Sequence, residues 1–261
     1  MAQLEVSDFA QAVIDRMAEC KDPRFHQIMS SLVKHAHAFM REVDLTPEEW
    51  IAGIQFLTAT GQKCDDKRQE FILLSDTLGL SMLTVALNND KPPGCTQATV
   101  LGPFHVPGAP HYEHGADITN GAEGEPCLVR GRVRSIDGRP AAGAVVEVWQ
   151  ADAQGRYDVQ YPGLDRHRAR AVLHAGADGG FHFKTIVAQA YPIPTDGPAG
   201  DLLRATARHP WRPAHLHFMI RADGYEPLVT HVFRRGDPYL DSDAVFGVRE
   251  SLVADWVRQP G

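Results

Sequence analysis

Apolar residues recur at helical spacing through the first third of the chain. From residue 25 to residue 43 they fall three or four positions apart, which predicts a helix with one apolar face. The sequence Thr-Pro-Glu-Glu at residues 46–49 predicts the start of a second helix. Threonine can cap, proline suits the first turn, and the glutamate three positions on can close a capping box. We expect this helix to end near Gly61 and a third helix to run from about residue 65 to residue 88.

Short alternating segments replace the helical pattern from Cys127 onwards. Turn sequences such as Asp-Gly at residues 137–138 and 223–224 separate them, which favours an antiparallel sandwich or barrel. The predicted strands are residues 128–133, 144–149, 181–187, 214–220 and 227–233. Two long segments, residues 152–174 and 188–212, are expected to be loops, and loops of that length are usually functional.

The fold class is therefore mainly β with an α-helical N-terminal part. Between residues 102 and 126 the chain is rich in Gly, Pro, His and Asp, which predicts an irregular link. We place a domain boundary near Pro110. This gives a helical N-terminal and linker domain of residues 1–110 and a β domain of residues 111–261.

The composition argues against several classes of protein. The 261 residues carry a net charge of -7, which argues against a nucleic-acid surface because such a surface needs a basic stripe. No run of 18 apolar residues is present, so no membrane insertion is expected. The acidic N-terminus lacks the features of a signal peptide, and the four separated cysteines form no Cys-x-x-Cys pair. We expect a cytoplasmic protein with reduced thiols.

The segment from Trp211 to Ile220 holds a His-x-His pair. In a strand, alternate side chains share a face, so His215 and His217 point one way while the apolar residues between and after them point to a core. Two imidazoles on a stiff strand form half of a metal site, and Arg212 places a cation close by. The alternative is a polar strand face in a chain with 13 histidines.

Three further polar residues are candidates for functional groups. Tyr157 and Tyr191 each lie in one of the two long loops, next to turn residues. Either could be a half-buried aromatic with a hydrogen-bonded hydroxyl. Asp76 interrupts the third predicted helix, where it is either a solvated or ion-paired carboxylate or a functional group.

Several separated motifs, taken in order, resemble the intradiol ring-cleaving dioxygenases, and most of all their hydroxyquinol 1,2-dioxygenase branch. The motifs are Gln-Glu-Phe-Ile-Leu-Leu-Ser-Asp at 69–76, Leu-Gly-Pro-Phe-His at 101–105, Gly-x-Tyr at 155–157, Tyr-Pro-Ile-Pro-x-Asp-Gly-Pro at 191–198, Arg-Pro-Ala-His-Leu-His-Phe at 212–218, Gly-Asp-Pro-Tyr-Leu at 236–240 and Val-Phe-Gly-Val at 245–248. The likeness extends over nearly the whole chain. It implies an antiparallel β-sandwich catalytic domain joined to a helical dimerisation domain.

The resemblance implies a non-haem ferric ion, Fe(3+), held by four side chains. They are Tyr157, Tyr191, His215 and His217. Two phenolates and one hydroxide neutralise the charge of a trivalent ion, and neutral imidazoles complete the shell. Hard anionic oxygen donors favour ferric iron, whereas a ferrous oxygenase site more often shows two histidines and one carboxylate.

The resemblance also implies a reaction. A catechol-type substrate binds as a dianion, displaces Tyr191 from the metal, and is cleaved by dioxygen between its two hydroxylated carbons. Arg212 would stabilise negative charge on the ring, with a surface ion pair to Asp201 as its alternative. His231 stands where catechol-type relatives usually carry glutamine. It would donate a hydrogen bond near the open face of the iron, or else be structural.

The implied substrate pocket contains mostly apolar residues. Its members are Leu73, Val100, Leu101, Gly102, Pro103, Phe104, Ile193 and Val245. Asp76 would accept a hydrogen bond from a third ring hydroxyl and would be left unpaired by catechol. The expected substrate is therefore hydroxyquinol (benzene-1,2,4-triol), which would give maleylacetate. The alternative is catechol, which would give cis,cis-muconate.

The helical first third would, by the same resemblance, pair two subunits into a homodimer that holds a phospholipid between them. The apolar stripes equally describe a helical cap on a monomer.

Two rival interpretations of the site stay open. One is a ferrous or zinc site in which a carboxylate, Asp158 or Asp196, joins the two histidines. The other is a transthyretin-like sandwich that binds a phenol without consuming oxygen.

Overall fold

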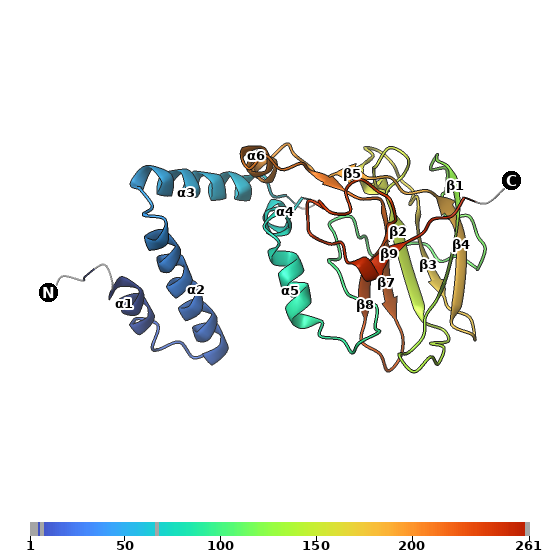
Figure 1. Cartoon of the computed structure of the whole chain (residues 1–261), viewed down its shortest axis with the longest axis horizontal. Coiled ribbons are helices and arrows are strands. Elements are labelled where there is room, and N and C mark those ends of the chain that lie inside the picture. Colours follow the sequence, from blue (N-terminus) through green and yellow to red (C-terminus); the bar gives the residue numbers. More distant parts are fainter. Residues whose placement is uncertain (1–4, 6–7, 66–67, 259–261) are drawn as a thin grey trace. The chain divides into compact units, whose positions relative to one another are not determined.

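The computed structural model describes residues 5, 8–65 and 68–258, and the chain forms two compact units (Figure 1). The first unit ends at Thr58 and the second begins at Ala59. The boundary predicted near Pro110 separates helices from strands. The two compact units divide the chain earlier, so the helices after residue 70 belong to the same unit as the sheets. Each unit is described by itself below.

The helices of the N-terminal region follow the predicted pattern, with one short addition. They are α1 (Phe9–Asp15), which the sequence did not predict, α2 (Pro23–Glu42) and α3 (Pro47–Gln62), whose last turn belongs to the second unit. The predicted capping box at the start of α3 is confirmed. Thr46 N–H donates to Glu49 Oε2 at 2.9 Å, and Glu49 N–H donates to Thr46 Oγ1 at 3.2 Å.

The prediction of one long third helix was wrong. Two helices, α4 (Glu70–Thr77) and α5 (Leu80–Asn88), meet at a bend of 78°. Gly79 adopts φ +74°, a left-handed conformation that ends a helix and that glycine adopts without strain. Within the described ranges no single helix is long and apolar enough to span a membrane. The bent α4–α5 pair meets that test only when its two halves are taken together, by length and composition.

The described part of the second unit contains three sheets, and the two that pack against each other confirm the predicted sandwich (Figure 1). The larger sheet has the order β3 (Arg170–His174), β2 (Val145–Gln150), β7 (His215–Arg221), β8 (Leu228–Arg234), β9 (Val253–Ala254), and the smaller one pairs β1 (Pro126–Arg132) with β4 (Gly180–Ile186). All pairs are antiparallel except β8 with β9. Val148, Phe183 and Phe218 belong to the core cluster that fills the space between the sheets.

Several elements lie in the two segments that we expected to be loops. The first contains the short 3-10 helix η2 (Asp158–Gln160) and all of β3. The second contains β5 (Tyr191–Pro192), α6 (Pro198–Ala205) and all of β6 (Trp211–Arg212), which pairs with β5. A further 3-10 helix, η3 (Glu250–Leu252), precedes β9. These elements are too short, or too rich in Pro and Gly, for sequence periodicity to detect.

Candidate metal centre

Strand β7 separates the core from the candidate site. Leu216 and Phe218 enter the sandwich core, while His215 and His217 project from the opposite face of the same sheet. Both histidines are nevertheless buried, with 2% and 1% of their surface exposed. The predicted alternation is therefore confirmed, and loops and helices on the outer face of the larger sheet enclose the imidazoles.

Neighbouring strands fix the position of the His217 ring. In the sheet register His217 lies opposite Trp149 of β2 on one side and His231 of β8 on the other. The Trp149 ring stacks on the His217 ring with centroids 4.7 Å apart and an angle of 16° between planes. His231 Nε2 lies 2.8 Å from His217 Nδ1. The imidazole is thus held between a stacked indole and a hydrogen bond.

Two tyrosines from separate segments reach the same place. Tyr157, from the segment after β2, places its hydroxyl 3.0 Å from His217 Nε2 and 3.5 Å from the hydroxyl of Tyr191 on β5. The two segments approach closely at Gly155, where φ is +71° and an added Cβ would lie 3.0 Å from the Tyr191 Cβ. The glycine of the Gly-x-Tyr motif therefore permits the two tyrosines to meet.

The arrangement of donor atoms fits a metal ion. His215 Nδ1 donates to the Pro213 carbonyl at 2.7 Å, so the lone pair of His215 lies on Nε2. That Nε2 lies 3.1 Å from His217 Nε2. Donors that share an ion at about 2.0–2.1 Å lie about 3 Å from one another. Two nitrogen and two oxygen donors therefore lie in sequence within 3.0–3.5 Å of one another, and the anionic oxygens of phenolates suit ferric iron.

Burial sets the protonation of this cluster. It lowers the pKa of His215 to about 3, helped by the positive charge of Arg212. Burial and the neighbouring His215 also lower the pKa of His217 well below its usual range. Both imidazoles are thus neutral near pH 7 and keep their lone pairs. Burial and the neighbouring Tyr191 raise the pKa of Tyr157 well above its usual range, a shift that a trivalent cation would reverse.

Arg212 is a buried member of the site and not the surface residue that we considered as its alternative. Only 2% of its surface is exposed, and its Nε donates to Asp243 Oδ1 at 3.0 Å. Its NH1 lies 3.4 Å from the Tyr191 hydroxyl and 3.4 Å from His215 Nε2. Asp201, the ion-pair partner that the surface alternative gave to Arg212, pairs with Arg204. The guanidinium therefore places a fixed positive charge beside the donor cluster.

His231 lies close to the two histidines of the donor cluster, since one ring nitrogen from each of the three lies within 4.8 Å of the others. Its Nε2 contacts the far nitrogen of His217, so it stands behind that imidazole in the sheet. Its Nδ1 is buried and has no hydrogen-bond partner among the described residues. In this position His231 can fix the tautomer of His217 and thereby its basicity.

Some of the predicted pocket residues lie in contact with one another or with the donor residues. Leu73, Ile193 and Val245 share one buried cluster. Phe104 stacks on Tyr157 with ring centroids 4.5 Å apart. A Cβ added at Gly102, where φ is +80°, would lie 3.0 Å from His217 Cε1, so this residue touches the site.

The other predicted pocket residues are placed less directly. Val100, Leu101 and Pro103 flank Gly102 in the chain, and their contact with substrate stays a prediction. Asp76 is 5% exposed and accepts a hydrogen bond from Ser81. Burial raises its pKa, and the positive charge of Arg212 opposes that shift. A carboxylate that interacts electrostatically with Arg212 lies near the metal centre.

Sequence reasoning missed a buried ion pair behind Tyr157. Arg170 is 1% exposed, and its guanidinium binds the Asp158 carboxylate and, at 3.0 Å, the Phe104 carbonyl. This pair joins the tyrosine segment to the aromatic wall of the site. It also occupies Asp158, and Asp196 pairs with Arg68 and Lys63. Both carboxylates of the rival metal site therefore have other partners.

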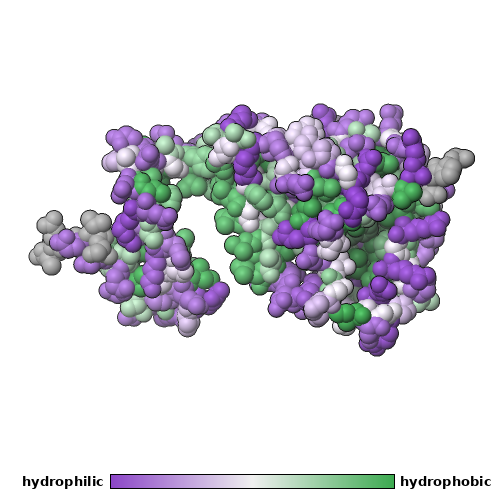
Figure 2. Space-filling view, viewed as in Figure 1, coloured by the Kyte–Doolittle hydropathy of each residue, from purple (hydrophilic) through white to green (hydrophobic). Residues whose placement is uncertain are grey.

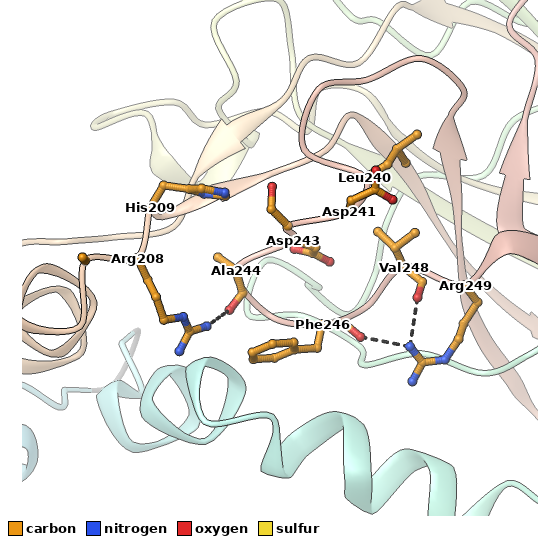
Figure 3. A pocket seen from close by; sticks show the side chains of 11 residues that line it. Arg208, His209, Leu240, Asp241, Asp243, Ala244, Phe246, Val248 and Arg249 are labelled. Carbon is orange, nitrogen blue, oxygen red and sulfur yellow. Dashed lines mark hydrogen bonds between the residues drawn. The ribbon is translucent and has the colours of Figure 1, made fainter.

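A cavity of about 470 Å³ lies beside the loop that carries Asp243 (Figure 3). On one of its walls, Arg208 donates to the Thr77 carbonyl at 2.7 Å and to the Ala244 carbonyl at 3.1 Å. Its guanidinium also lies over the Phe246 ring, 5.0 Å from the centroid. None of the four donor residues lines this cavity. Arg208 thus links α4 to the loop that carries the buried aspartate.

The fold and the donor set together define a class, a β-sandwich protein with a site for a non-haem metal ion. The comparison with known families identifies it further. Residues 100–259 match the family described as dioxygenase, and residues 22–96 match the family described as the catechol dioxygenase N terminus. The chain belongs to the intradiol ring-cleavage dioxygenases, a family that uses non-haem iron.

Relatives with known activities cover almost the whole chain. It is 70% identical over 259 residues to the 6-chlorohydroxyquinol 1,2-dioxygenase of Cupriavidus pinatubonensis, which covers 99% of this chain and 94% of that protein. It is 52% identical over 258 residues to the hydroxyquinol 1,2-dioxygenase of Nocardioides simplex, covering 99% and 88%. The crystal structure of hydroxyquinol 1,2-dioxygenase from Pseudomonas putida DLL-E4 matches with a TM-score of 0.94 at 50% identity, covering 98% and 89%.

Proposed function

We propose that the protein cleaves hydroxyquinol with dioxygen between its adjacent hydroxylated carbons, giving maleylacetate. The observation that carries this proposal is the close approach of Tyr157, Tyr191, His215 and His217 in a buried site. These four residues would hold ferric iron. Iron held there would supply Lewis acidity to the hydroxylated part of the ring. The names of relatives 50–70% identical to this chain support the choice of substrate.

The chain itself handles protons and charge around the ring. Tyr191 is placed to accept a substrate proton, because its hydroxyl is also within 3.4 Å of the Arg212 guanidinium, which favours neighbouring negative charge. Asp243 fixes that guanidinium from behind, at 3.0 Å. Phe104, stacked on Tyr157, covers one flank of the site and excludes water from it.

Asp76 would select among substrates. As a carboxylate it can accept a hydrogen bond from a third ring hydroxyl, which catechol lacks. It comes from α4, the same helix that supplies Leu73 to the buried cluster next to Ile193 and Val245. A buried acceptor without a partner costs about 1–3 kcal/mol, so catechol would bind less well.

Oxygen consumption tests the proposal. Purified, iron-loaded protein is given hydroxyquinol, 6-chlorohydroxyquinol or catechol in an oxygen electrode, with a control lacking protein because hydroxyquinol autoxidises. We expect fastest uptake with the triols and the appearance of maleylacetate from hydroxyquinol. Phenolate ligands should also give the iron-loaded protein a visible absorption band that disappears on iron removal. Uptake with catechol alone would show a catechol 1,2-dioxygenase, and no uptake would favour a binding protein.

We also propose a cytoplasmic homodimer with a phospholipid between its subunits. Apolar side chains support this, because Phe25, Leu32 and Phe39 on α2 are each more than half exposed in the single chain. Apolar residues also gather over α5, where Leu87 is 74% exposed (Figure 2). Light scattering after size exclusion tests the dimer, since a mass near 28.7 kDa would contradict it. Solvent extraction followed by mass spectrometry tests the lipid.

A further inference from the structure

Four histidines outside the metal centre gather where the segment of residues 110–118 passes from β3 to β4. They are His111, His114, His174 and His182, and all four are exposed. β4 belongs to the smaller sheet, whereas the metal centre lies on the outer face of the larger one (Figure 1). The proposed ring cleavage uses none of these histidines.

Backbone hydrogen bonds hold this group in place. Tyr112 N–H donates to the Val172 carbonyl of β3 at 2.9 Å. Three residues on, Gly115 N–H donates to the His182 carbonyl of β4 at 2.9 Å. The segment is therefore tied to both sheets, and His114 stands directly beside His182 on a rigid frame.

The rings of His114 and His182 are spaced like metal ligands. Their centroids are 5.3 Å apart with 57° between planes. In the metal centre the rings of His215 and His217 are 4.8 Å apart with 62° between planes. Two imidazoles that bind one ion at about 2.0–2.1 Å in tetrahedral geometry have centres about 5 Å apart. The outer pair thus has nearly the geometry of the inner pair.

A hydrogen bond selects the tautomer of the neutral His114 ring that can bind a metal through Nδ1. Its Nε2 lies 2.7 Å from the His174 carbonyl, which can only accept, so Nε2 carries the proton and Nδ1 keeps its lone pair. Metal-binding histidines commonly donate their other N–H to a backbone carbonyl in this way. The ring of His182 forms no hydrogen bond with any residue in the described part of the chain. Its Nε2 lies 3.3 Å from the position of a Cβ at Gly115, so the absent side chain leaves space beside it.

We propose that His114 Nδ1 and the His182 ring bind a divalent transition-metal ion, with water in the remaining positions. Imidazole donors suit Ni²⁺, Cu²⁺ and Zn²⁺ better than Mg²⁺ or Ca²⁺. The carboxylate of Asp178 interacts electrostatically with His114 and adds negative charge, although it also pairs with Arg132. His111 and His174 form a different kind of pair. Their rings are stacked, with centroids 5.6 Å apart and 17° between planes, which differs from the 62° between the rings of His215 and His217.

Titration of the tag-free, iron-loaded full chain with NiCl₂ tests the site. Calorimetry should show one Ni²⁺ per chain in addition to iron. His114→Ala and His182→Ala should each weaken Ni²⁺ binding at least tenfold, whereas His111→Ala, a matched change on the same surface, should leave it within twofold. Because none of the three residues touches the catalytic machinery, circular dichroism and oxygen uptake should stay as in the unsubstituted protein.

Two results would overturn the proposal. One is Ni²⁺ binding that is absent at 1 mM or unchanged by His182→Ala. The other is an equal loss in His111→Ala and His182→Ala, which would assign the ion to a different set of donors. Neither result bears on ring cleavage, so the two proposals fail independently.

Discussion

Replacing Asp76 by alanine should change which ring the enzyme prefers. The carboxylate is 5% exposed, and Ser81 is its hydrogen-bond partner. A hydrogen bond to a charged group contributes about 1.5–3 kcal/mol. Its loss should lower kcat/KM for hydroxyquinol about 10- to 150-fold, since about 1.4 kcal/mol corresponds to a factor of ten. Catechol makes no such bond, so its kcat/KM should stay within about threefold or rise.

The assay measures initial oxygen uptake with both substrates over a range of concentrations. Ser81→Ala serves as the matched control because it removes the partner that orients Asp76 and leaves the carboxylate in place. It should shift the preference in the same direction by a smaller factor. Equal losses on hydroxyquinol and catechol in Asp76→Ala would refute the argument. In that case the aspartate would support the fold of α4 and would play no part in recognising the third hydroxyl.

Two further changes test the supports of the site. His231→Ala removes the hydrogen bond to His217 Nδ1 and should weaken iron retention against a chelator about 10- to 100-fold. His231→Gln restores a hydrogen-bond acceptor and should retain more iron than His231→Ala. Equal retention in the unsubstituted protein and in both variants would contradict this role. Glu70→Ala removes the buried carboxylate that accepts from Ala199 N–H at the start of α6 and pairs with Arg68. It should lower the free energy of unfolding in urea by about 1.5–3 kcal/mol, and a change below about 0.5 kcal/mol would show that the contact contributes little.

The strand pattern carried most of the information about the site. Alternation alone placed His215 and His217 on one face and the core residues on the other, because the period of a strand leaves no other choice. The two tyrosines were different. Nothing local to Tyr157 or Tyr191 predicts that their hydroxyls meet, and only the family's ordered motifs brought them together.

Short-range sequence rules could not predict the residues that support the site. Asp243 lies 31 positions after Arg212, and no short-range rule pairs two charges at that separation. His231 could be predicted as a member of the site, yet its place behind His217 depends on the register of β7 with β8. The break at Gly79 was also missed, because an isolated glycine costs a helix only about 1 kcal/mol and apolar spacing continues across it.

The corner between α4 and α5 decides which side chain Asp76 meets. In an unbroken helix, residues five positions apart lie about 140° apart around the axis, so Asp76 and Ser81 would face different directions. The 78° turn lets the two side chains meet. Ring selection would then depend on one backbone torsion at Gly79, a residue with no side chain to offer a substrate. Efforts to redesign selectivity by exchanging only the groups that touch the ring would overlook this position.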